Sequence, residues 1–168
     1  MISLMVVVTL NSVLFPLLVV LLLWRLKFID SIHMQGDKER YGPLIASMLF
    51  YFWVFWTVHK QFPVPALAES FLLGTFLTTA GAFMATIFYK ISMHAAAWGG
   101  VLSFAILCTF QHTQNALLLL IAAILLAGIA GAARLFLNAH TRQQLYSGYL
   151  VGFVMQLLAF FIVHQFLK

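Results

Sequence analysis

Six runs of mostly apolar residues, each close to the length needed to cross a bilayer, take up almost the whole sequence. A membrane-spanning helix needs about 20 such residues. Only 8% of the 168 residues are charged and 64% are hydrophobic, whereas soluble domains carry about 25% charged residues. We therefore expect residues 1–168 to form one all-α, integral-membrane six-helix bundle. The predicted spans are roughly 3–24, 43–59, 66–89, 94–111, 115–138 and 145–167.

The same runs exclude several other classes of protein. They are continuously apolar, whereas the strands of a membrane β-barrel alternate. The first run has no basic residue ahead of it and is too long for a secretory signal. The net charge is +5, but the sequence has no run of five or six like charges that would favour binding of nucleic acid. The expected surroundings are a lipid bilayer, with the oligomeric state left open.

Prolines and glycines predict where helices bend, end or pack. Pro16 should kink the first span, and Pro63 and Pro65 should separate the second from the third. Small residues in membrane helices allow close approach. We interpret six glycines as packing positions: Gly99, Gly100, Gly128, Gly131, Gly148 and Gly152.

The charged residues are distributed unequally between the two sides that six spans define. The links after the first, third and fifth spans open on one side, and seven of the nine basic residues fall there. Ionisable groups at membrane helices are costly and suggest a functional site. Arg25, Lys27, Lys38, Arg40, Lys90, Arg134 and Arg142 are the seven.

Three helix starts are predicted on this basic side. Pro43 suits the first helical position of the second span, Ser92 is a plausible N-cap, and Thr141 to Gln144 has the spacing of a capping box. Helix N-termini carry unpaired N–H groups and partial positive charge, so they attract anions. With Lys38, Arg40, Lys90 and Arg134 nearby, the expected ligand is a phosphate.

Two histidines on the same side, His94 and His140, are sufficient for phosphoryl transfer. One neutral imidazole can attack phosphorus while a second, protonated, gives its proton to the leaving oxygen. A two-metal hydrolase needs more carboxylates than the one short loop supplies. We therefore expect neither metal nor cofactor. Arg134 and His140 are six positions apart, so the chain must turn between them for both to reach one phosphate.

At these residues the sequence resembles the type 2 phosphatidic acid phosphatase superfamily, membrane lipid phosphatases with a haloperoxidase-like helical core. The family pattern Ser-Arg, five residues, His, three residues, Asp is similar to Ala133 and Arg134, His140, and Gln144, with a glycine following at Gly148. The serine and the aspartate are replaced.

Two further family patterns have weaker counterparts. Pro-Ser-Gly-His is similar to residues 91–94, which keep Ser92 and His94, and Lys, six residues, Arg-Pro is similar to Lys38, Arg40 and Pro43 at altered spacing. The resemblance implies a lipid phosphate or isoprenoid diphosphate hydrolase that forms a phosphohistidine.

The resemblance also assigns roles to residues. It implies His140 as nucleophile, His94 as general acid and Arg134 and Arg40 as phosphate clamps, with Ser92 and Lys38 assisting. Gln144 stands where the family has an aspartate. A neutral amide can accept the ring N–H and fix the tautomer, but it stabilises an imidazolium less. Lys90 has no family counterpart, and it either approaches the phosphate or extends to the membrane surface.

Two other functions remain open. A catalytically weak relative would bind anionic lipid or a partner protein, as Gln144 and the weak first pattern suggest. A haem-binding electron carrier would use paired histidines inside the bundle, and a colourless purified protein would exclude it. Orientation stays open as well: without the four proposed phosphate-side residues, three basic residues face two, and the positive-inside count decides nothing.

Overall fold

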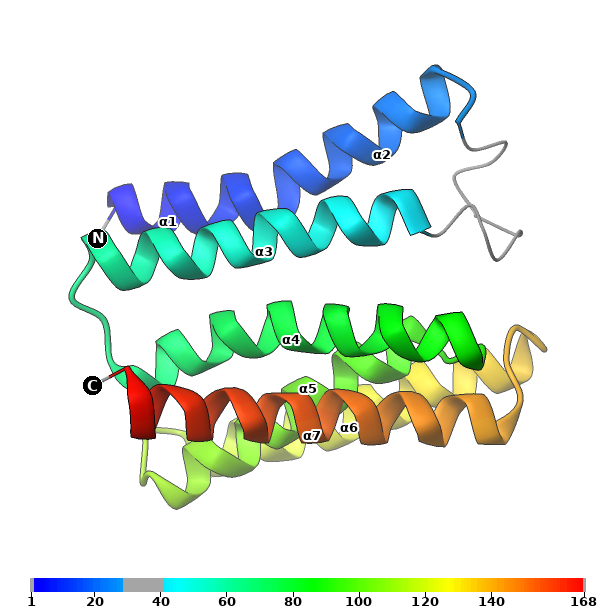
Figure 1. Ribbon diagram of the computed structural model, residues 1–168. Coiled ribbons are helices and arrows are strands. Elements are labelled where there is room, and N and C mark those ends of the chain that lie inside the picture. Colours follow the sequence, from blue (N-terminus) through cyan, green and yellow to red (C-terminus); the bar gives the residue numbers. More distant parts are fainter. Residues whose placement is uncertain (1, 29–40, 168) are drawn as a thin grey trace. The chain divides into compact units, whose positions relative to one another are not determined.

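Every regular element of the protein is a helix in the residues that the computed structural model describes, 2–28 and 41–167 (Figure 1). Six helical stretches are long and apolar enough to cross a membrane. This confirms the prediction of an all-α, six-helix membrane protein, and each span begins and ends within a few residues of its predicted bounds. The elements are α1 (Ile2–Thr9), η1 (Leu10–Leu14), α2 (Phe15–Arg25), α3 (Tyr41–Gln61), α4 (Ala66–Phe88), α5 (Met93–Phe110), α6 (Ala116–Phe136) and α7 (Arg142–Phe166).

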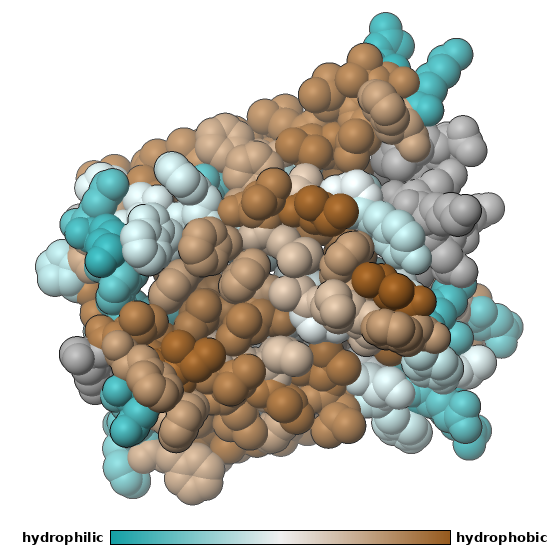
Figure 2. All heavy atoms as spheres, in the orientation of Figure 1, coloured by the Kyte–Doolittle hydropathy of each residue, from teal (hydrophilic) through white to brown (hydrophobic). Residues whose placement is uncertain are grey.

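Apolar residues cover the sides of the helices, and hydrophilic residues gather at the helix ends (Figure 2). On α6, for example, Leu118 and Ile129 are 67% and 65% exposed. Side chains of this kind on a helix surface fit lipid as the surrounding solvent. The chain is a multi-pass membrane protein by this measure.

The contacts divide the chain into two compact units, Met1–Pro65 and Ala66–Lys168. In the first unit, α1, η1 and α2 form one span. The expected effect of Pro16 takes the form of a π turn at Leu10–Leu14, just before the proline, and the helix bends there (Figure 1). The Asn11 amide donates to the Val7 carbonyl oxygen at 2.9 Å, which satisfies a backbone group beside the irregular turn.

Helix α3 follows in the same unit and begins at Tyr41, so Pro43 occupies its first turn, two residues deeper than predicted. A proline is tolerated there because first-turn N–H groups have no acceptor inside the helix. The Phe15 and Phe50 rings, 5.5 Å apart, pack α2 against α3. The helix ends at Gln61, before the predicted proline break.

The second unit is built around α5 and α7, which run in the same direction and touch through backbone. A Cβ on Gly148 would lie 2.6 Å from the Ser92 carbonyl oxygen, and one on Gly152 would overlap the carbonyl of Ala96. Gly99 likewise faces the Tyr149 backbone. These contacts confirm that the glycines pack, as small residues do in membrane helices.

Helices α4 and α6 flank this pair through polar contacts. The Gln156 amide of α7 is buried and donates to the Ser70 carbonyl oxygen of α4 at 3.1 Å. Gly74 leaves space for that amide. On the other side, the Tyr149 hydroxyl donates to the Ala127 carbonyl oxygen of α6 at 2.5 Å. Together these contacts hold α4, α5 and α6 around α7.

Gly128 was also interpreted as a packing position, and this is wrong. It is exposed on α6, and a Cβ there would have no neighbour within 4 Å. Gly131, one turn later, does pack, because a Cβ there would lie 2.8 Å from the Tyr149 hydroxyl oxygen. The side of α6 that faces its neighbours therefore passes through Gly131 and not through Gly128.

The two glycines of opposite environment give a matched test of helix packing. We expect Gly152→Ala to destabilise the protein by about 1–3 kcal/mol, because the new methyl meets the backbone of α5. Gly128→Ala should be neutral or stabilising, since alanine is the better helix former by up to about 1 kcal/mol. Thermal unfolding in detergent measures both. Equal effects of the two substitutions would contradict this packing arrangement.

Candidate functional site

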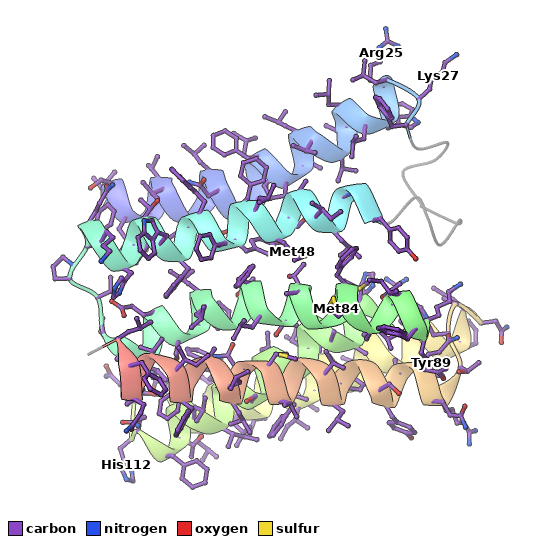
Figure 3. The ribbon with its side chains drawn as sticks, viewed as in Figure 1. Arg25, Lys27, Met48, Met84, Tyr89 and His112 are labelled. Atoms are coloured by element: carbon purple, nitrogen blue, oxygen red, sulfur yellow. The ribbon has the colours of Figure 1, made fainter. Side chains whose placement is uncertain are left out.

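The α4–α5 link and the α6–α7 link lie at the same end of the second unit (Figure 1). Tyr89, in the first of these links, and His112, after α5, mark its opposite ends (Figure 3). The Ser92 N–H donates to the Gln144 carbonyl oxygen at 3.1 Å, which ties the start of α5 to the first turn of α7. Four of the predicted site residues lie at this end of the unit. His94 is in the first turn of α5 and Arg134 is near the end of α6. His140 is in the α6–α7 link and Gln144 is in the first turn of α7.

The start of α5 has the predicted N-cap. Ser92 Oγ accepts the Ala95 N–H at 3.3 Å. Ser92 is fully buried, so its hydroxyl holds the helix start in place and sets the position of His94, two residues on. The predicted contact of Ser92 with phosphate stays a prediction.

The start of α7 has the predicted capping box. Thr141 Oγ1 accepts the Gln144 N–H at 3.3 Å, and Gln144 Oε1 accepts the Thr141 N–H at 3.2 Å. Both bonds satisfy donors that a helix start otherwise leaves unpaired. The Gln144 side chain is thereby fixed at the first turn, facing back toward His140.

The chain turns between Arg134 and His140, as their spacing requires. The Ala139 N–H donates to the Arg134 carbonyl oxygen at 3.1 Å, and the Asn138 N–H donates to that of Leu135 at 3.0 Å. Asn138 takes the left-handed conformation, with φ of 50°. This is the Schellman ending of a helix, with asparagine in place of glycine. It reverses the chain within a few residues.

Arg134 and His94 are in direct contact across α6 and α5. The Arg134 Nη2 lies 2.7 Å from the His94 Nε2. A guanidinium has no acceptor and stays charged, so the ring nitrogen must accept. His94 in this state is therefore neutral, with any ring proton on Nδ1.

The His140 ring is oriented by Gln144. Its Nδ1 lies 3.1 Å from Gln144 Oε1. The same oxygen accepts the Thr141 N–H, which can only donate, so the amide orientation is fixed and His140 Nδ1 must donate to it. In a neutral His140 ring the lone pair is then on Nε2, which is the arrangement a nucleophilic imidazole needs.

A cleft of about 470 Å³ opens beside His140. Its polar lining comes from the turn and the first residues of α7. It includes Asn138, which the sequence analysis did not name, and Arg142, which it counted among the basic residues without assigning it a role. Both residues lie between Arg134 and Gln144 in the sequence, and this position could have marked them as candidate site residues. Arg142 is exposed and adds a second guanidinium at this end of the unit.

Three further residues, Lys90, Lys38 and Arg40, were predicted to bind phosphate. Lys90 is half-buried in the α4–α5 link, and its contact with phosphate stays a prediction. Lys38 and Arg40 lie outside the described residues. Within residues 2–28 and 41–167, no three His, Cys, Asp or Glu side chains gather as a metal site requires.

No protein-family model, curated protein or solved structure matches this chain.

Proposed function

We propose that the protein is an integral-membrane, metal-independent phosphatase that removes phosphate from a lipid phosphate monoester or an isoprenoid diphosphate through a phosphohistidine. The observation that supports the proposal is the position of two histidines at neighbouring helix starts, each in contact with a polar side chain. His140 donates through Nδ1 to Gln144, and His94 lies against Arg134 at the neighbouring helix start. An oriented nucleophile, a second imidazole and a phosphate-binding fork are the groups that such a reaction needs.

The position of the site favours a lipid substrate. His94 belongs to the first turn of one membrane span, and His140 lies two residues before the first helical residue of another. A phosphate headgroup at this level leaves its tail in the surrounding bilayer. The guanidiniums of Arg134 and Arg142 supply positive charge for a monoester or a diphosphate.

In the first step, the lone pair on His140 Nε2 attacks phosphorus, and the bond from phosphorus to the lipid oxygen breaks. The leaving oxygen takes a proton from His94. The His140 ring, now bonded to phosphorus, carries positive charge and keeps its Nδ1–H bond to Gln144 Oε1. Arg134 stabilises the charge on the equatorial phosphate oxygens.

In the second step, water attacks phosphorus and gives a proton to His94, which is then restored to its acid form. The bond between nitrogen and phosphorus breaks, inorganic phosphate leaves and His140 Nε2 regains its lone pair. The same imidazole thus serves as acid and then as base.

Substrate binding must rearrange one contact before the first step. Arg134 donates to the nitrogen of His94 that has to carry the acidic proton. A phosphate between them gives the guanidinium a charged acceptor and frees His94 Nε2 to be protonated. Exchange of a neutral acceptor for a charged one favours this rearrangement.

Phosphate release by the detergent-purified protein tests the proposal. The panel is phosphatidic acid, phosphatidylglycerol phosphate and polyprenyl diphosphates, with excess EDTA, beside His140→Ala. We expect release that survives EDTA and is lost in the variant. EDTA-sensitive release would mean different chemistry, and no release from any lipid would favour the second candidate, a binding protein for anionic lipid.

That second candidate is favoured by one observation, the direct contact of Arg134 with His94. A protein that only binds phosphate has no need to free His94. Anionic vesicles containing phosphatidic acid should then retain the protein without turnover. Equal retention of wild type and Arg134→Ala on those vesicles would remove the support for this candidate.

Gln144 offers a test of how the nucleophile is oriented. We expect Gln144→Leu to lower kcat by at least roughly 10²-fold, since a wrong tautomer of a catalytic histidine can cost about 10⁴-fold. Gln144→Glu keeps the acceptor and adds charge, so kcat should hold or rise. Thr141→Ala removes one cap bond and leaves the ring contact, so its cost should fall on stability, at about 1 kcal/mol. Full activity in Gln144→Leu would show that the amide does not orient His140.

A further inference from the structure

Two buried hydroxyls in the second unit differ from the other hydroxyls of its helices. Ser and Thr side chains inside a helix usually donate to a carbonyl one turn earlier. Ser70, Thr75, Thr79, Thr86 and Thr109 do so here. The hydroxyls of Thr78 and Ser103 have no hydrogen-bond partner in the described part of the chain. Both side chains are at least nine-tenths buried.

Each of the two hydroxyls lies near the middle of its span. A Cβ on Gly100 would lie 3.4 Å from Thr78 Oγ1 and 3.7 Å from the Gly152 carbonyl oxygen, so α4, α5 and α7 meet at this level. Ser103 follows Gly100 by one turn of α5, on the face that carries Ala96 and Gly99 against α7. Thr78 and Ser103 are therefore about one helical turn apart along the same three-helix junction.

Gln156 adds a third polar side chain to this junction. It is one turn after Gly152 on α7, fully buried, and it fills the space beside Gly74 on α4. Because α5 and α7 run in parallel, the same one-turn step brings Ser103 to the level of Gln156. Polar groups at the middle of a membrane span are expensive unless they are satisfied.

We propose that Thr78 and Ser103 bind an ordered water molecule at the junction of α4, α5 and α7. A buried water bridges polar groups that are otherwise unsatisfied and makes two to four hydrogen bonds. Two unpaired hydroxyls, each with one donor and two acceptor positions, meet that requirement. The site joins α4 to α5 through polar contacts, and it is independent of the phosphatase proposal.

The test is a double-mutant cycle on thermal unfolding of the full chain in detergent, with Ser103→Ala, Thr78→Val and the double variant. A hydroxyl that holds a water stabilises the protein, so each single variant should lower Tm by about 2–4 °C. The double variant should lose less than the sum, because either change releases the same water. Unsatisfied hydroxyls would behave in the opposite way, and their removal would raise Tm.

Thr79→Val is the matched control. Thr79 neighbours Thr78, is equally buried and donates to the Thr75 carbonyl oxygen at 2.9 Å. Its effect should add to that of Ser103→Ala without coupling. A rise or no change in Tm for either test variant, or additive effects of Thr78→Val and Ser103→Ala, would overturn the proposal.

A high-resolution experimental map of the wild-type protein is a second test, and it does not depend on whether the variants fold. We expect density for one water within hydrogen-bond distance of Thr78 Oγ1 and Ser103 Oγ. A direct bond between the two hydroxyls would also couple the variants, and the map distinguishes this case. Continuous protein packing with no such density would overturn the proposal.

Discussion

Replacing His140 with alanine is expected to lower phosphate release by about 10⁴-fold or more, since removal of a covalent nucleophile leaves only binding and electrostatic effects. The variant should keep its fold, because the ring contacts Gln144 at a helix start and lies outside the packed interior. Phosphate release and trapping of an acid-labile phosphoenzyme measure the effect. The phosphoenzyme should be absent from His140→Ala.

His112→Ala is the control for this prediction. His112 is an exposed histidine beyond the end of α5, at the opposite end of the unit from Tyr89 (Figure 3). Its replacement should leave turnover unchanged. Comparable losses in the two variants would mean that the measured activity does not depend on His140.

Replacing Arg134 is expected to have the second largest effect. Arg134→Ala should lower kcat/KM by roughly 10²- to 10³-fold, the loss typical of a group that stabilises charge in the transition state. Arg134→Lys should recover only part of it, because an ammonium cannot bind two phosphate oxygens in a fork. The kinetics on the best lipid of the panel measure both variants.

Arg25→Ala controls for the loss of positive charge, since Arg25 is exposed at the end of α2 and makes no part of the proposed site. It should turn over lipid at the wild-type rate. Full recovery by Arg134→Lys would show that charge alone matters and that the guanidinium geometry does not.

Local signals allowed much of the fold to be predicted. The caps at Ser92 and Thr141 and the break at Pro63 and Pro65 depend on a few neighbouring residues, so the sequence alone marks these helix bounds. Pro16 signalled an irregularity, but its form, a π turn satisfied by the Asn11 amide, depends on a side-chain bond that spacing does not reveal.

Those parts of the candidate site that depend on residues close together in the sequence could be predicted. The turn after Arg134 and the capping box at Gln144 were both expected. The direct contact of Arg134 with His94 was not, since it joins residues 40 positions apart on separate helices. The buried hydroxyls of Thr78 and Ser103 escaped notice for the same reason. Each is a single polar residue in an apolar run, and only the packing of three helices brings them together.

One oxygen atom, Gln144 Oε1, receives both the Thr141 backbone N–H and the His140 ring N–H. Complete opening of the first turn of α7 therefore also releases the His140 ring. Activity should fade on warming while the helices of the membrane core are still intact, because a terminal turn opens at lower free energy than a packed interior. We therefore expect the proposed activity to be lost at a lower temperature than that at which the protein unfolds.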